Sequence, residues 1–453
     1  MDSWRRADVP VLPGSGPAPR LHDTVSGELI LASAGPVATL YACGITPYDA
    51  THVGHAATYT AWDLLVRAWL DAAPENPGQP RFTVRYVQNV TDVDDPLLER
   101  AERDGEDWRE LADREIRRYR SDMEALRVLP PTHLIGAVEA LPVIERFNAR
   151  LADRGALYGM DEDTYFARSA DPAFGALSGA GTACGYDLAE MADLSASRGG
   201  DPGRPGKKDP LDVLVWRAQR PGEPSWDSRF GPGRPGWHVE CAAIAAEYLG
   251  QSFDVQAGGS DLIFPHHEMS ASHARVAFGP GVFARVYVHA GLVSYLGEKM
   301  SKSLGNLVFI SRLLADGADP MAVRMALLAH HYRRDWEWTD AVLADGAARL
   351  ARWRSAIAHA EAAAPPGMIA SDTDPPITGF SAPGAGPADP ADEVLAGVRA
   401  RMRDDLDAPG ALAVIDRWAD RVLADAPARL TPGDAAGARL VKDTADALLG
   451  LSL

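Results

Sequence analysis

The sequence predicts an α/β fold built on a parallel sheet. Residues 37–43 and 84–90 are apolar runs of the length and composition of buried strands. The segment between them, residues 54–73, has helical spacing of apolar side chains, among them Ala57, Trp62, Leu65, Val66 and Leu70. A strand, a helix and a strand in succession, with polar motifs at the strand ends, indicate a parallel α/β sheet.

The remaining segments continue this pattern and then change it. A polar helix is expected after the second strand, through about residue 125. Residues 126–205, with their patches rich in Gly, Ala and Ser, are expected to form an inserted region. Strand-like runs resume at residues 212–216 and 286–296. The α/β domain is therefore predicted in two halves, residues 1–125 and 206–320.

The C-terminal part, residues 321–453, is predicted to be a helical domain rich in Ala, Leu and Arg. Seven of the chain's 34 prolines fall within residues 362–391. Proline-rich segments of this kind resist regular structure, so this stretch is expected to be a flexible linker. Helices are expected again at residues 392–425 and 434–449.

Composition limits the class of protein. The chain has 453 residues, 46% of them apolar and 24% charged, as in globular proteins with several structural units. We find no run of ~18 apolar residues and no apolar stretch behind the first six residues, so neither a membrane span nor a secretory signal is expected. Three cysteines do not make a disulfide framework, which favours the cytoplasm. The net charge of −18 argues against a large surface for nucleic acid.

Two short motifs point to the activation of a carboxylate by ATP. His52 and His55 are three residues apart at the start of the first predicted helix, where backbone N–H groups favour anions. Lys299 and Lys302 have the same spacing in a loop rich in Gly and Ser. Attack of a carboxylate on the α-phosphate builds negative charge, which such donors and cations stabilise. We therefore expect these four residues to be catalytic, with Lys302 at the ATP.

A metal site is a second possibility raised by the residues. Cys43 ends the first predicted strand, Cys241 follows a polar turn, and His266 opens a predicted helix. Two thiolates and one imidazole would leave the fourth position of a zinc ion open, as in catalytic sites. Each residue alone is equally consistent with core packing, and Cys184 is expected to be a small apolar side chain. Asp92, Asp94 and Asp95 are expected to cap a helix.

Several motifs resemble those of cysteinyl-tRNA synthetases and their close relatives. They are YACGITPYD at 41–49, HVGH at 52–55, YVQNVTDVDD at 86–95, GRPGWHVEC at 233–241, DLIFPHHE at 261–268 and KMSKS at 299–303. The resemblance covers roughly residues 35–345. It implies a class I synthetase-type Rossmann core with an inserted connective region, and one zinc ion held by Cys43, Cys241 and His266. In that family the zinc takes the thiolate of the substrate cysteine.

The resemblance also implies which residues bind the cysteinyl-adenylate. By their places in the motifs these are Cys43, Gly44, Ile45, Thr46, Thr58, Asn89, Val90, Thr91, Trp237, Gly259, Ser260, Asp261 and Val293. His52, His55, Lys299 and Lys302 would stabilise the phosphates of ATP, with which Mg²⁺ is expected.

Departures from the synthetase pattern bear on the acceptor. Ile45 and Pro47 replace the residues usual in cysteinyl-tRNA synthetases, and Ser270 replaces a glutamate that is an additional zinc ligand there. The loop at 198–202 is similar to an element of the cysteine:glucosaminyl-inositol ligases of mycothiol synthesis. Residues 392–453 hold eight Lys and Arg against eleven Asp and Glu, unlike a surface that binds tRNA.

The resemblance therefore implies an ATP-dependent ligase that joins L-cysteine to the amine of glucosaminyl-inositol through a cysteinyl-adenylate, releasing AMP and pyrophosphate. We expect small-molecule substrates, no nucleic acid, no membrane and a monomer. Two alternatives stay open: a cysteinyl-tRNA synthetase with tRNA as acceptor, and a non-catalytic relative acting as a binding module.

Overall fold

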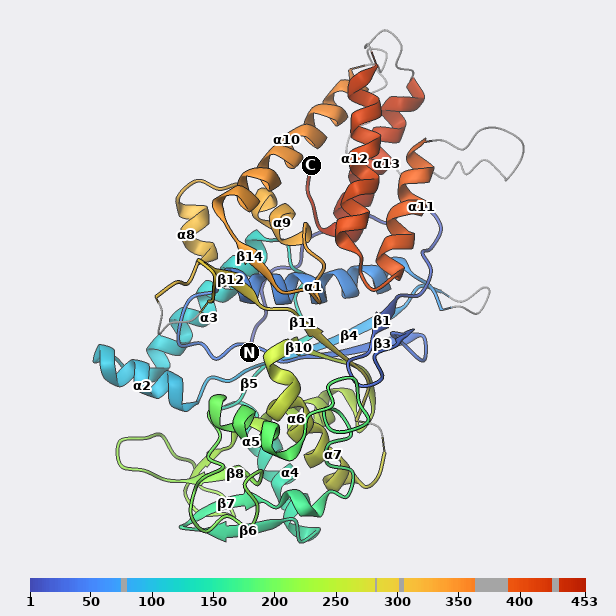
Figure 1. Ribbon diagram of the computed structural model, residues 1–453. Helices are drawn as coiled ribbons and strands as arrows, with labels where there is room; N and C mark the ends of the chain where they lie inside the picture. Colours follow the sequence, from blue (N-terminus) through green and yellow to red (C-terminus); the bar gives the residue numbers. More distant parts are fainter. Residues whose placement is uncertain (75–79, 282, 301–304, 363–389, 426–431) are drawn as a thin grey trace.

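A five-stranded parallel sheet forms the centre of the protein, with strands in the order β11-β10-β3-β4-β5 (Figure 1). The computed structural model describes residues 1–74, 80–281, 283–300, 305–362, 390–425 and 432–453. The strands are β3 (Val37–Ala42), β4 (Thr83–Val90), β5 (His133–Gly136), β10 (Phe253–Gly259) and β11 (Ala284–Ala290). Both faces of the sheet are covered, which explains the continuous apolar runs in its strands. The predicted α/β fold is confirmed.

Helix α1 (Val53–Asp71) connects β3 to β4 and is buried over most of its length (Figure 1). Its large side chains, among them Trp62, Leu65 and Trp69, are fully buried against the sheet and the C-terminal helices. The helix therefore begins at the sheet edge where strands β3 and β10 end, and continues into the core between the parallel sheet and the C-terminal helices.

The polar segment after β4 forms two helices rather than the single predicted one. These are α2 (Asp95–Asp104) and α3 (Trp108–Ala125). Gly105 ends α2 with φ of 68°, a conformation that glycine adopts without strain. Asp94 caps α2 and Asp95 lies in its first turn, as predicted. The prediction is wrong for Asp92, whose carboxylate accepts from the Val138 N–H at 2.9 Å after β5. Asp107, which was not predicted, caps α3.

A second, antiparallel sheet lies beyond the parallel one, with strand order β6-β7-β8-β9. It comprises β6 (Leu157–Met160), β7 (Asp163–Phe166), β8 (Val213–Ala218) and β9 (Gly233–Pro235), and helices α4 (Leu141–Asp153) and α5 (Leu188–Ser197) belong to the same region. The region differs from the expected insertion at 126–205. Strand β5 pairs with β4 in the main sheet, and β8 pairs with β7, contacts that sequence spacing alone does not reveal.

The chain then returns to the main sheet through α6 (Trp237–Leu249) and α7 (Glu268–Phe278), which pack against each other. A small sheet of β12 (Val293–Tyr295), β13 (Glu298–Lys299) and β14 (Trp336–Trp338) follows, with α8 (Ile310–Ala315) and α9 (Pro320–Leu328). Near the N-terminus, β1 (Arg20–His22) and β2 (Leu29–Leu31) form a hairpin.

Four helices form the C-terminal region: α10 (Asp340–Glu361), α11 (Pro390–Arg403), α12 (Ala408–Ala424) and α13 (Pro432–Leu449). They confirm the predicted helical character, and most of the predicted linker, residues 363–389, lies outside the described residues. Helices α11 and α13 pack directly against α1 (Figure 1). Of the helices in the described ranges, none has the length and hydrophobicity to cross a bilayer.

A buried ion cluster joins these parts. Asp63 of α1 accepts hydrogen bonds from Arg67 and from Arg324 of α9, and all three side chains are at most 1% exposed. The two guanidinium groups also donate to carbonyl oxygens, Arg67 to Asp446 and Arg324 to Leu449, both in α13. The C-terminal helix is thereby attached to α1 and α9.

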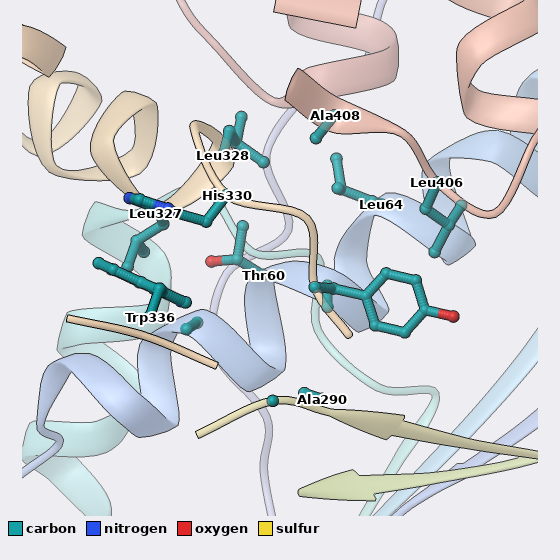
Figure 2. A pocket seen from close by; sticks show the side chains of 13 residues that line it. Thr60, Leu64, Ala290, Leu327, Leu328, His330, Trp336, Leu406 and Ala408 are labelled. Atoms are coloured by element: carbon teal, nitrogen blue, oxygen red, sulfur yellow. The ribbon is translucent and has the colours of Figure 1, made fainter. Parts of the chain in front are cut away.

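A small cavity lies where α1, α9 and the C-terminal helices meet (Figure 2). Thr60, Leu64, Leu328 and Leu406 lie around it, and beside it the ring of His330 stacks on Trp336 at 4.0 Å. Its volume of about 20 Å³ is room for one water molecule. It is too small for a substrate.

Candidate active site and metal centre

A cavity of about 540 Å³ opens at the carboxyl ends of strands β3 and β10. In open α/β sheets this edge is the usual place for ligands. Most residues predicted to bind substrate line it: Cys43, Gly44, Ile45, Thr46, His52, His55, Thr58, Trp237, Gly259, Asp261 and Val293. Residues predicted from four separate motifs therefore share one cavity.

The first turn of α1 supplies the two histidines of this cavity. His52 is the N-cap residue, and its Nδ1 accepts a hydrogen bond from the Gly54 N–H at 3.1 Å. The rings of His52 and His55 stack with centroids 3.8 Å apart. The first turn carries no acidic side chain. Two imidazoles and a helix N-terminus at the cavity wall make a site suited to phosphate.

Three of the predicted binding residues instead lie behind the cavity wall. Asn89, Val90 and Thr91 are each at most 2% exposed and do not line the cavity. The Asn89 side-chain oxygen accepts from the Gly44 N–H at 2.9 Å, and the Thr91 N–H donates to the Ile45 carbonyl at 2.9 Å. A Cβ at Gly44 would lie 1.6 Å from the Asn89 carbonyl oxygen. These residues therefore hold the 43–46 segment in place.

Of the KMSKS motif at 299–303, the described residues are Lys299 and Met300. Lys299 lies in β13, paired with Ser294 of β12, and Met300 lines the cavity. Lys302 lies outside the described residues, so the structure does not test its predicted place at the ATP. Ser260, also predicted to bind substrate, is in the turn after β10 but does not line the cavity. Its neighbours Gly259 and Asp261 do.

Cys43, Cys241 and His266 meet at one end of the cavity, as the resemblance implied. Their ligand atoms all lie within 4.8 Å of one another. The two Sγ atoms are 3.9 Å apart, and His266 Nε2 is 3.2 Å from Cys241 Sγ. All three residues are at most 5% exposed.

This geometry fits a zinc ion. Zn–S distances of about 2.3 Å and Zn–N distances of about 2.0–2.1 Å place tetrahedral ligand atoms about 3.5–3.8 Å apart. Burial lowers the pKa of His266 well below its ordinary value, so the imidazole is neutral, the form that binds a metal. Ser270, at the position of the synthetase glutamate, donates to the His266 carbonyl oxygen at 2.8 Å. The described residues thus offer three ligands and leave a fourth position open.

Histidine and tryptophan rings surround the metal ligands. Trp237, the first residue of α6, lies one turn before Cys241 and stacks on the His266 ring at 4.4 Å. Nδ1 of His238 is 3.1 Å from Nδ1 of His266. Nε2 of His267 is 3.2 Å from Cys43 Sγ. Burial lowers the pKa of His238 to about 4, so it too is neutral.

Sequence reasoning missed several residues of the site. Tyr48, Asp49, Gly291 and Leu292 line the cavity. Tyr48 and Asp49 lie inside a motif that had been recognised, so their position next to Thr46 and His52 was a usable signal. Gly291 carried no such signal: a Cβ there would lie 2.3 Å from the Arg334 carbonyl oxygen, a contact made only in the fold.

The loop at 198–202 approaches the metal ligands from the inserted region. Arg198 donates a hydrogen bond to the carbonyl oxygen of Phe264, two residues before His266. Asp201 of the same loop accepts from Tyr165 at 2.6 Å and from Lys207 at 3.0 Å. Cys184 is half-buried and does not belong to the metal group.

Comparison with known proteins gives consistent results. The model of the class I (C) tRNA synthetase catalytic domain matches residues 32–348. An L-cysteine:1D-myo-inositol 2-amino-2-deoxy-alpha-D-glucopyranoside ligase from Thermomonospora curvata is 56% identical over all of both chains. Ligases of the same name from Streptomyces griseus and Streptosporangium roseum are 53% and 55% identical, again over the whole of both chains.

Solved structures with low sequence identity share the fold. Mycobacterium tuberculosis methionyl-tRNA synthetase in complex with methionyl-adenylate has a TM-score of 0.55 at 19% identity, over 91% of this chain and 89% of its own. A putative arginyl-tRNA synthetase from Campylobacter jejuni has a TM-score of 0.56 at 12% identity, over 93% and 94%. These similarities support the class I synthetase-type architecture.

Proposed function

We propose that this chain, a member of the class I (C) tRNA synthetase catalytic-domain family, activates cysteine in the cavity beside Cys43. Within the family it belongs to the L-cysteine:1D-myo-inositol 2-amino-2-deoxy-alpha-D-glucopyranoside ligases. It is an ATP-dependent cysteine ligase of mycothiol synthesis. In this reaction the carboxylate of cysteine attacks the α-phosphate of ATP and releases pyrophosphate. The amine of glucosaminyl-inositol then attacks the cysteinyl-adenylate and releases AMP.

One observation carries the proposal: Cys43 both lines the cavity and belongs to the metal group. Cys43, Cys241 and His266 would hold a zinc ion, which when bound offers an open position that prefers a thiolate to a hydroxyl. A cysteine in the cavity would thus be selected over serine by its side chain. The indole of Trp237, stacked on His266, would shield this end of the cavity from water.

The wall formed by the first turn of α1 would bind the phosphates. His52, His55 and the N-terminus of α1 offer donors where negative charge develops on the α-phosphate and pyrophosphate. Lys299 and Lys302 flank Met300, which lines the cavity, in the sequence and would contribute positive charge, together with Mg²⁺ bound to ATP. Asp261 would accept a hydrogen bond from the ammonium group of cysteine.

The acceptor is a small aminosugar in this proposal. The acidic C-terminal helices, with eight basic against eleven acidic residues in 392–453, do not offer the basic surface that tRNA requires. We further propose that the protein works as a monomer in the cytoplasm and binds neither nucleic acid nor membrane.

Two assays test the proposal. ATP–pyrophosphate exchange should depend on cysteine, and AMP should form with glucosaminyl-inositol but not with tRNA. Replacing a transition-state donor, His55→Ala, should lower the exchange rate by about 100-fold or more. The exposed His133, outside the cavity, gives the control His133→Ala with an unchanged rate. Charging of tRNA with cysteine would refute the aminosugar as acceptor, and an absence of exchange would refute the adenylating function.

A further inference from the structure

A chain of hydrogen bonds leads from Cys43 through two buried histidines to a threonine. Nε2 of His267 is 3.2 Å from Cys43 Sγ, and its Nδ1 is 2.7 Å from Nε2 of His289. Nδ1 of His289 is in turn 2.7 Å from Thr24 Oγ1. His267 is fully buried and His289 is 6% exposed. None of the three outer residues lines the cavity, and the reaction described above does not use them.

The chemistry of the groups fixes the direction of this chain. Both rings are buried, their facing nitrogens are 2.7 Å apart, and none of the ring contacts named above is with a carboxylate, so both rings are taken as neutral. A neutral imidazole has one N–H and one lone pair, so the chain can run only toward Cys43 or only away from it. A metal-bound cysteine is a thiolate, which accepts but cannot donate. The chain must then run inward from Thr24.

We propose that Thr24, His289 and His267 form a relay that presents the Nε2–H of His267 to the sulfur of Cys43. The inference rests on the metal site of the proposed function. The Thr24 hydroxyl donates to Nδ1 of His289, and Nε2–H of His289 donates to Nδ1 of His267. His267 is therefore a positioning residue: its N–H fixes the orientation of the Cys43 thiolate and takes up part of its charge.

The backbone around the relay is built to hold it. A Cβ at Gly258 would lie 3.0 Å from the His267 ring, so only glycine leaves the ring its full space. The turn that carries Thr24 is attached to β11 by two hydrogen bonds to Tyr287. The Thr24 N–H donates to the Tyr287 carbonyl at 2.8 Å, and the Tyr287 N–H donates to Asp23 at 2.9 Å. Thr24 is thus held beside the strand that carries His289.

The metal itself supplies the test. His267→Gln keeps an N–H donor near the Nε2 position, whereas His267→Met has similar volume and no donor. We expect His267→Met to weaken Zn²⁺ affinity by about 10–100-fold, measured by competition with a chromogenic chelator, and His267→Gln to retain most of it. In the Co²⁺-substituted protein, the sulfur-to-cobalt charge-transfer band should move to longer wavelength in His267→Met, because the thiolate lone pair loses its hydrogen bond.

A second variant probes the outer end of the relay. Thr24→Val removes the hydroxyl at nearly constant volume and should move the same band in the same direction by a smaller amount. The matched control is Thr444→Val, which removes a 2.7 Å hydrogen bond of another threonine, fully buried in α13, and should leave the band unchanged.

The outcomes separate the two proposals. A wild-type protein that binds Zn²⁺, with unchanged affinity and spectra in folded His267→Met, overturns the relay and leaves the metal site standing. If that variant fails to fold, an unchanged band in Thr24→Val overturns the relay instead. A wild-type protein that binds no Zn²⁺ overturns the metal site and the relay together.

Discussion

Replacing Asp63 by asparagine should destabilise the protein strongly without touching the cavity. The Asp63 carboxylate accepts from Arg67 Nε and from the Leu129 N–H, each at 2.8 Å, and from Arg324. Burial alone would raise the pKa of Asp63, but the two guanidinium groups outweigh it and lower the pKa below its ordinary value. Asp63→Asn leaves two fully buried arginines without a counter-charge. Loss of one partner of a buried ion pair costs about 3–5 kcal/mol, a large part of a typical 5–15 kcal/mol of stability.

Urea unfolding followed by tryptophan fluorescence measures this effect. The control is Asp316→Asn, whose partner Arg312 is at 2.9 Å on an exposed face of α8 and whose loss should cost about 0.5 kcal/mol or less. Because the folded-state pKa of Asp63 is lowered, its contribution is present above the unfolded pKa of about 3.9 and is lost as the pH falls through the folded value. A loss below about 1 kcal/mol at pH 7 would refute the role of Asp63 as counter-charge.

Three further predictions concern the metal ligands, the 43–46 segment and α3. Cys241→Ala should lose zinc, measured by metal analysis, together with cysteine-dependent pyrophosphate exchange, whereas Cys184→Ala should keep both; full activity in Cys241→Ala would contradict the metal mechanism. Gly44→Ala places a methyl group 1.6 Å from the Asn89 carbonyl oxygen and should reduce the exchange rate at least tenfold, and an unchanged rate would show that the segment can shift at no cost. Burial raises the pKa of Asp122 to about 7, so its stabilising effect is present below pH 4 and is lost as the pH rises to 7. Asp122→Asn should therefore raise the melting temperature relative to wild type at pH 8 but not at pH 4, and equal melting temperatures at pH 8 would argue against this reasoning.

Much of the main sheet could be predicted from local sequence. The strands at 37–43 and 84–90 and the helix from 54 were recognisable because strands covered on both faces have continuous apolar runs, and buried helices have regular apolar spacing. The two-helix arrangement of α2 and α3 was missed because the residues on both sides of Gly105 are mostly polar and have the composition of one continuous surface helix. The inserted sheet extends past residue 205 because β8 pairs with β7 across a long loop, and no local pattern records such a pairing.

The site shows the same limit. Motifs placed Cys43, Cys241 and His266 in one group, which the structure brings together within 4.8 Å. They did not distinguish residues that line the cavity from those that support it: Asn89 was predicted to bind the adenylate, and it does not line the cavity. Its motif neighbours suggested contact with substrate, whereas its side chain binds the backbone of Gly44. How deeply a motif residue is buried depends on the fold and cannot be inferred from the motif itself.

Helix α1 has a mechanical consequence for the enzyme. Its 19 residues span about 28 Å, from the cavity past the buried arginine cluster at Asp63 to Asp71, which accepts hydrogen bonds from Arg399 of α11. Because a helix is stiff along its axis, a small shift of the C-terminal end of α1 would also displace its N-terminal end at the cavity. Substitutions in α11 or α13 that shift α1 are therefore expected to move His52 and His55 at the cavity. A survey of natural variants that examines only the residues lining the cavity would overlook such substitutions in the C-terminal helices.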